Sequence, residues 1–212
     1  MSRNEKQERE EIEIDLDEIN SHIIYDEWGQ KICFGDIYKD KKTIVIFLRH
    51  FLCFMGKEYV DDLALIPEKM FKDTDVQLVL IGCASWKFIE GFREDTGYAG
   101  LLFVDPDRTL YKGIGCLESI KADSIKDSKV SKHIKSGVFM GILKSAWRGM
   151  KYRQMQGDLN QLGGAFVIGP GAEVHYQHFD LTAADQAPIN DLLLTCGLSP
   201  VNFENDQRVL TV

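Results

Sequence analysis

Cys53 stands where a cysteine side chain could act as a nucleophile. It follows the apolar run TIVIFLR (43–49) and precedes a segment whose apolar residues recur at helical spacing. At the start of a helix, unpaired N–H groups and the positive end of the helix dipole favour the thiolate form of a cysteine. A thiolate attacks a peroxide or a disulfide and becomes a sulfenic acid or a mixed disulfide. Since free cysteines are also often buried and inert, position alone leaves both interpretations open.

Arg49 and His50 lie close enough in the chain to act on Cys53. Arginine is always charged and can hold a thiolate or an anionic substrate group, while histidine can also move a proton. At the end of a strand, either residue can equally be exposed or form a structural ion pair. We predict Cys53 as the nucleophile, with Arg49 as a candidate stabiliser of the thiolate and His50 as a further candidate catalytic residue.

Alternating strands and helices surround this segment. Ser85 begins a predicted helix that Gly97 ends, and Pro67 ends or bends the helix after Cys53. The order β–α–β–α–β with short connections predicts a parallel sheet with helices on both faces. Sites in such sheets form at the carboxyl ends of the strands, which is where Cys53 lies. The predicted strands are residues 43–49, 76–82 and 100–106.

Two antiparallel hairpins flank this unit in the sequence. The first is predicted over residues 22–34, where two short apolar runs flank a turn, and the second over 163–179, where a Gly-Pro-Gly turn separates two predicted strands. A final helix is predicted before Gly197. We divide the chain into an acidic arm (1–20) and a domain (21–212) that contains a helical insertion at about 118–155.

Composition excludes several classes of function. The net charge is −8, and residues 1–20 alone carry −5, so we expect no nucleic-acid partner. A basic amphipathic helix predicted over 137–154 can pack on its own domain or lie on an anionic membrane, and packing is favoured. No apolar window is long enough to span a membrane, and the N-terminus lacks the apolar core of a signal peptide. Five irregularly spaced cysteines indicate a reducing compartment, so we predict a cytoplasmic protein without a metal or cofactor.

The sequence FLRHFLCFMGKEYVDDLALIP resembles the active-site segment of the peroxiredoxin-like 2 family, within the AhpC/TSA antioxidant group, and most closely its AAED-type members. The similarity continues through VDPDRTLYKGIG and QGDLNQLGGAFVIGPGAEVHYQHFD, and it covers about residues 22–212. The resemblance implies a thioredoxin-like (peroxiredoxin-like) three-layer α/β/α sandwich with a mixed central sheet. It also implies thiol-dependent reduction of a peroxide or disulfide substrate, lipid-derived peroxides included, with electrons from a thioredoxin- or glutathione-type reductant.

Gly56 departs from the pattern of this family, which commonly has Cys-x-x-Cys. Cys53 matches the first cysteine, but Gly56 cannot close a local disulfide. An external thiol can then resolve the oxidised sulfur, or a distant cysteine can, or catalysis has been lost. Cys83 is the candidate distant cysteine, because it ends the strand that is predicted to lie beside 43–49. As a small apolar residue at a strand end, it can equally be structural.

Two glycines occupy the position where thioredoxins and many peroxiredoxins have a proline. Gly163 and Gly164 allow a substrate to approach the backbone closely, as Gly56 does, although a simple bulge explains the pair as well. We predict a peroxide-reducing enzyme with the single reactive cysteine Cys53. The alternatives are a redox-inactive binding or regulatory module of the same fold and a protein that binds membrane surfaces. The oligomeric state stays open.

Overall fold

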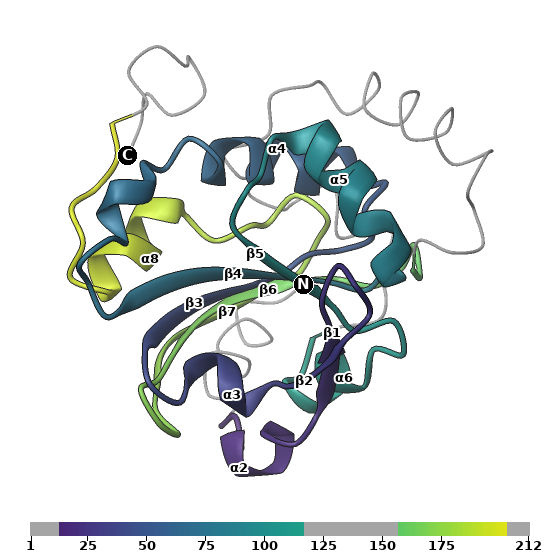
Figure 1. Cartoon of the computed structure of the whole chain (residues 1–212), viewed down its shortest axis with the longest axis horizontal. Coiled ribbons are helices and arrows are strands. Elements are labelled where there is room, and N and C mark those ends of the chain that lie inside the picture. The colour runs from purple at the N-terminus through teal and green to yellow at the C-terminus, as the bar shows by residue number, and fades with distance from the viewer. Residues whose placement is uncertain (1–12, 117–156, 203–212) are drawn as a thin grey trace.

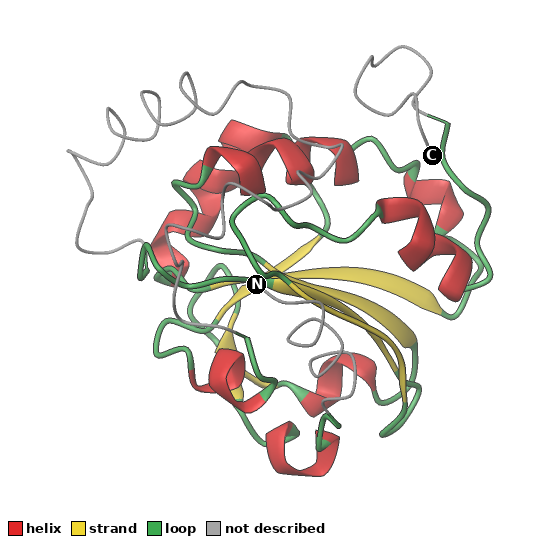
Figure 2. Cartoon of the chain, turned by 180° about the vertical axis from the view of Figure 1, so that it is seen from behind, coloured by secondary structure: helices red, strands yellow, loops and turns green. Residues whose placement is uncertain are grey.

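The computed structural model describes residues 13–116 and 157–202. Within these ranges a seven-stranded mixed sheet lies between two layers of helices, as Figure 1 shows and Figure 2 repeats from behind. The strand order is β2-β1-β5-β4-β3-β6-β7. The strands are β1 (Ile23–Tyr25), β2 (Lys31–Cys33), β3 (Lys42–Phe47), β4 (Val76–Gly82), β5 (Leu101–Val104), β6 (Gly164–Ile168) and β7 (Val174–Phe179). The α-helices are α2 (Leu16–Ile19), α3 (Gly35–Tyr38), α4 (Phe54–Leu63), α5 (Ile89–Thr96), α6 (Thr109–Gly113) and α8 (Ile189–Thr195).

The three predicted parallel strands form the centre of the sheet. β3 pairs with β4 and β4 with β5, both in parallel, and Phe47 lies opposite Ile81. The carboxyl ends of β3 and β4 therefore meet at one edge, as predicted. β5 ends two residues before the predicted limit of 106, because Asp105 turns the chain into α6 by accepting a hydrogen bond from the Leu110 N–H at 2.8 Å.

Antiparallel strands complete both sides of the sheet and confirm the two predicted hairpins. β1 pairs with β2 and touches β5, while β6 pairs with β3 on one side and β7 on the other. The mixed central sheet that the sequence predicts is therefore present. β6 begins at the second glycine of the Gly163-Gly164 pair, which places that pair beside the end of β3.

Alternate residues of the central strands enter two separate cores. Ile44 and Ile46 of β3 join the core under α4, α5 and α8, whereas Val45 and Phe47 join the core next to α2, α3 and α6 (Figure 1). Both faces of β3 are thus covered, which explains its unbroken apolar sequence. The helix that follows Cys53 lies on the first of these faces.

The helices agree with the predicted start and stop residues. Ser85 leads into the 3₁₀ turn η2 (Trp86–Phe88), which α5 continues until Gly97, a glycine with a φ of 68°. α4 ends at Leu63, ahead of Pro67, whose carbonyl instead begins the 3₁₀ turn η1 (Glu68–Met70). One predicted helix is thus a 3₁₀ turn joined to an α-helix.

The folded part of the chain includes residues that precede position 21. The Asp15 side chain caps α2, and Leu16 and Ile19 of that helix are buried. The predicted insertion at 118–155 and the basic helix at 137–154 lie outside the described residues. In the ranges that the structure describes, no helix has the length and apolarity needed to cross a membrane.

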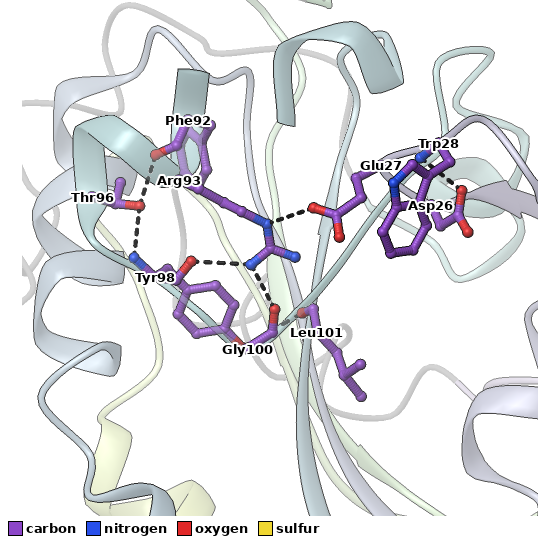
Figure 3. A network of polar contacts seen from close by, with 9 residues as sticks. All are labelled: Asp26, Glu27, Trp28, Phe92, Arg93, Thr96, Tyr98, Gly100 and Leu101. Atoms are coloured by element: carbon purple, nitrogen blue, oxygen red, sulfur yellow. Dashed lines mark hydrogen bonds and ion pairs between the residues drawn. The ribbon is translucent and has the colours of Figure 1, made fainter. Parts of the chain in front are cut away.

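Arg93 of α5 ties the first hairpin to the body of the domain (Figure 3). Its Nε donates to Glu27 at 3.0 Å, and its Nη1 donates to the carbonyl oxygens of Tyr98 at 3.1 Å and Gly100 at 2.8 Å. Thr96 continues the network, because its hydroxyl donates to the Phe92 carbonyl at 2.8 Å. One guanidinium group therefore joins the turn before β2, the end of α5 and the start of β5.

Candidate active site

Cys53 occupies the position directly before α4. Its backbone is extended, with φ −71° and ψ 111°, and its carbonyl accepts the N–H of Lys57 at 2.9 Å, which begins the helix. The Cys53 N–H donates to the His50 carbonyl at 2.9 Å, so a tight turn delivers the cysteine from the end of β3. The residue is 4% exposed. The structure thus places Cys53 at the helix start that the sequence predicts.

The Arg49 side chain contacts the Cys53 sulfur directly. Its Nη1 lies 3.2 Å from Sγ, while Nε donates to the Gln161 carbonyl at 3.0 Å and Nη2 to the Leu159 carbonyl at 2.7 Å. Arg49 is buried, and these three contacts fix its guanidinium plane. A charged donor within reach of a sulfur makes a charge-assisted hydrogen bond once that sulfur is a thiolate.

The backbone between β3 and Cys53 is held from both sides of the sheet. The Leu48 N–H donates to the Ile81 carbonyl at 2.7 Å, and the Tyr111 hydroxyl lies 2.6 Å from the Leu48 carbonyl oxygen and 2.7 Å from that of Ile81. On the side of α5, the ring of Phe51 stacks on Phe92 with a centroid distance of 4.2 Å. The turn that carries Arg49 and Cys53 is therefore rigid.

His50 is buried and neutral. Burial, together with the charge of Arg49, lowers the pKa of His50 to about 3, although Asp158 acts in the opposite direction. Its Nδ1 is buried and has no hydrogen-bond partner among the described residues. His50 therefore stays uncharged throughout the physiological pH range, and Arg49 supplies the fixed positive charge next to Cys53.

Replacing His50 by glutamine is expected to reduce the loss of stability at acidic pH. The unfolded chain protonates His50 near pH ~6.5, but the folded chain does so only near pH 3. Between these values the unfolded state binds more protons, so the free energy of unfolding falls with falling pH, by up to about 1.4 kcal/mol per pH unit. Urea unfolding of both proteins at a series of pH values measures the difference. Asp180 titrates with the opposite sign, so the comparison of the two proteins isolates His50, and equal slopes would contradict the prediction.

Cys83 lies on the other face of the sheet from α4. It packs in the core next to α2, α3 and α6, where it is 1% exposed. Burial raises the pKa of the Cys83 thiol to about 12, against the opposing charges of Arg108 and Arg49. A thiol that stays protonated is a slow nucleophile toward an oxidised sulfur. Arg49 therefore contacts the Cys53 sulfur, whereas Cys83 packs in the opposite core, and a resolving role for Cys83 stays a prediction.

The three predicted glycines differ in their surroundings. A Cβ placed on Gly56 would have one described neighbour within 4 Å outside the adjoining residues and the backbone of α4, the Cβ of Cys53 at 3.8 Å. A Cβ on Gly163 would lie 2.0 Å from the Phe47 carbonyl oxygen, and one on Gly164 would lie 2.7 Å from the His178 carbonyl oxygen. At positions 163 and 164 the absence of a side chain thus allows close packing against neighbouring backbone, whereas position 56 has room for a side chain.

Asp180, which is not among the residues predicted from the sequence, lies in a small pocket beneath the start of α4. It follows β7 directly and is 5% exposed. Burial and the nearby Asp185 raise the pKa of Asp180 well above its usual range, although Arg49 and the Gly163 N–H act in the opposite direction. The pocket has an accessible volume of about 10 Å³, close to that of one water molecule. Its lining comprises Ile46, Phe47, Leu48, Arg49, Gly56, Tyr59, Gly164, Ala165, Asp180, Gln186 and Ala187.

The chain is similar to a family of antioxidant enzymes. Residues 65–181 match the model of the family described as "AhpC/TSA antioxidant enzyme", a range that begins after Cys53. "Peroxiredoxin-like 2C" of Mus musculus is 39% identical over 191 residues, which cover 89% of this chain and 83% of that protein. "Thioredoxin-like protein AAED1, chloroplastic" of Arabidopsis thaliana is 28% identical over 183 residues, which cover 85% of this chain and 72% of that protein.

Solved structures share the fold. Peroxidoxin BcpB from Mycobacterium tuberculosis superimposes with a TM-score of 0.53 at 13% sequence identity, and the match covers 83% of this chain and 91% of that one. At this identity the likeness concerns the fold alone. It confirms the predicted thioredoxin-like, peroxiredoxin-like architecture.

Proposed function

Because the chain belongs to the AhpC/TSA antioxidant family, in its peroxiredoxin-like 2 branch, we propose that it reduces peroxides through Cys53 and an external thiol. The observation that carries this proposal is the contact of 3.2 Å between Arg49 Nη1 and the sulfur of Cys53 at the start of α4. The contact gives a thiolate a fixed positive charge in a buried site, where electrostatic interactions are stronger than in water.

The first step is attack of the Cys53 thiolate on one peroxide oxygen. A sulfur–oxygen bond forms, the oxygen–oxygen bond breaks, and the leaving oxygen takes the electron pair and one proton to become water or an alcohol. Sulfur is oxidised to sulfenic acid and the peroxide is reduced. Arg49 can donate both to the sulfur and to an oxygen bound beside it, because its guanidinium carries five N–H groups.

The second step needs a reductant from outside the chain. Gly56 carries no thiol, and Cys83 faces the opposite core with a raised pKa. We therefore assign the attack on the sulfenic acid to a thiol of a thioredoxin- or glutathione-type reductant. That attack releases water and forms a mixed disulfide, which a second thiol of the reductant cleaves to regenerate Cys53 and release a disulfide.

Mapping of sulfenic acid on the reduced protein tests the proposal. A slight excess of hydrogen peroxide, followed by a sulfenic-acid trapping reagent and mass spectrometry, is expected to label Cys53 ahead of the other four cysteines. Repeating the reaction with a lipid hydroperoxide examines the lipid-derived substrates that the sequence suggests. If Cys53 stays unlabelled while the protein is folded, the binding or regulatory module becomes the better interpretation.

Replacing Arg49 by lysine is expected to slow the reaction of Cys53 with hydrogen peroxide by about 10²-fold. Lysine keeps the charge but cannot contact the sulfur and two carbonyl oxygens at once, because it lacks the planar fork of arginine. Stopped-flow measurement of sulfenic acid formation gives the rate. Arg108→Lys is the matched control, since Arg108 holds the same loop through Asp158 at 3.0 Å. An equal loss in both variants would attribute the effect to the loop and contradict the role of Arg49.

A further inference from the structure

We propose that Asp180 is the general acid that protonates the oxygen leaving the peroxide when the Cys53 sulfur attacks. The inference rests on the proposed function and concerns its first step. That step releases a strongly basic hydroxide or alkoxide, and a proton donor placed beside it lowers the barrier. The assignment of Asp180 rests on the residues that line the pocket beneath α4.

The pocket connects Asp180 with the surroundings of the sulfur. Arg49 and Gly56 line it together with Asp180. Arg49 also contacts the Cys53 sulfur at 3.2 Å. At position 56, the Cβ of Cys53 is the one described heavy atom, apart from the adjoining residues and the backbone of α4, within 4 Å of the point where a side chain would begin. A peroxide held by Arg49 beside the sulfur can therefore direct its leaving oxygen into the pocket, whose volume of about 10 Å³ is near the lower limit for one water molecule.

The lining of the pocket suits a small polar group. The side-chain oxygen of Gln186 is buried and accepts no hydrogen bond from any described residue, while its nitrogen donates to the Ala183 carbonyl at 2.7 Å. Asp180 is anchored on its other side, where its N–H donates to the Gly163 carbonyl at 3.2 Å. A hydroxyl group in the pocket would therefore find both an acceptor and an acid.

The surroundings of Asp180 favour its protonated form before the reaction. Burial and the charge of Asp185 raise the pKa of Asp180 above its usual range. After the transfer, Arg49 and the Gly163 N–H favour the carboxylate. His178 Nε2 lies 3.7 Å from Asp180 Oδ1 and 3.9 Å from Asp185 Oδ1, and it contacts the Asp185 carbonyl oxygen at 2.7 Å.

Replacing Asp180 by asparagine is the test, because the amide has the same size but is not an acid. Sulfenic acid formation with hydrogen peroxide is expected to slow by about 10²-fold. Two other reactions of the same sulfur serve as matched references. Iodoacetamide releases iodide and peracetic acid releases acetate, and neither leaving group needs a proton, so both rates are expected to stay within about a factor of two. Equal hydrogen peroxide rates in the variant and the wild type, or a common fall of all three reactions, would overturn the proposal.

The wild-type protein separates this inference from the proposed function. If its Cys53 reacts with iodoacetamide but not with either peroxide, the proposed function fails, whatever the role of Asp180.

If the Asp180→Asn variant does not fold, the pH dependence of the wild-type reaction tests the role of Asp180 instead. The ratio of the hydrogen peroxide rate to the iodoacetamide rate is expected to fall as rising pH removes the proton of Asp180. A constant ratio would reject the general acid. The groups that face Asp180 are Arg49, Tyr59, Tyr111, His178 and Asp185.

Discussion

Replacing Cys53 by serine is expected to abolish sulfenic acid formation and to reduce peroxide consumption to the rate measured without protein. The serine hydroxyl is not ionised at neutral pH, and the described structure places no base against it that would activate it, because His50 is buried with an unpartnered Nδ1 and Arg49 is a cation. Peroxide consumption in the presence of a thioredoxin- or glutathione-type reductant, together with trapping of sulfenic acid, measures both quantities.

The same substitution is expected to leave the fold intact. Cys53 makes no side-chain hydrogen bond to the first turn of α4, whereas serine is among the preferred residues at that position. The free energy of unfolding is therefore expected to stay the same or to rise by up to about 1 kcal/mol. A variant that is folded but inactive attributes the activity to the sulfur. Full activity in Cys53→Ser would instead show that another cysteine reacts, and the enzyme proposal at this site would be abandoned.

Cys83→Ser is the control that examines the resolving step. If an external thiol resolves Cys53, turnover in this variant is expected to match that of the wild type. Accumulation of sulfenic acid in Cys83→Ser would contradict this expectation and show that Cys83 reaches the active site despite its place in the opposite core. Because Cys83 is fully buried, a thermal unfolding curve must accompany the measurement.

The strands and the helix start at Cys53 could be predicted because both depend on local sequence. The unbroken apolar run of β3 requires two covered faces, and the change to helical spacing places Cys53 at a helix start. The face on which Cys83 lies follows from the alternation of β4, since Cys83 is two residues beyond Ile81 and shares its core. Nothing in the spacing, however, says which of the two faces α4 covers. The sequence therefore predicts that the ends of β3 and β4 are adjacent, but not that α4 and Cys83 lie on opposite faces of the sheet.

The partners of Arg49 and the position of Asp180 could not be predicted in this way. Arg49 donates to carbonyl oxygens 110 and 112 residues further along the chain, and a carbonyl leaves no mark in the sequence because every residue has one. Asp180 is a single acid after a strand that contains two histidines and a glutamine, a common place for a solvated residue. β7 pairs with β6, which pairs with β3, and this arrangement brings Asp180, Gly56 and Arg49 around one pocket.

Replacing Gly56 by cysteine is expected to change how the oxidised sulfur is resolved. A Cβ at position 56 would lie 3.8 Å from the Cβ of Cys53, which is close to the mean Cβ–Cβ distance of about 3.8 Å in disulfides. Outside the adjoining residues and the backbone of α4 itself, no other described heavy atom lies within 4 Å of it, so the new side chain begins in open space. Cysteine also lacks the entropic cost of glycine in a helix. The backbone thus holds the two positions at disulfide distance although the chain has one thiol there.

One equivalent of hydrogen peroxide is expected to convert Gly56→Cys to a form with an internal bond between positions 53 and 56, without lasting sulfenic acid. The loss of two thiols per molecule and peptide mapping under non-reducing conditions measure this bond. Turnover is expected to depend more strongly on a dithiol reductant, because a monothiol must now open a short internal disulfide that readily re-forms. Gly56→Ser is the matched control, since it has nearly the same volume but no thiol and should accumulate sulfenic acid at Cys53 as the wild type does.

The two variants together separate geometry from chemistry at this site. If Gly56→Cys keeps both thiols after oxidation while Gly56→Ser accumulates sulfenic acid, the sulfurs do not meet, and the predicted disulfide distance is contradicted. If both variants fail to oxidise, the added side chain itself blocks the pocket shared by Gly56, Arg49 and Asp180. Formation of the bond would show that one substitution is enough to let this site resolve a sulfenic acid at Cys53 internally.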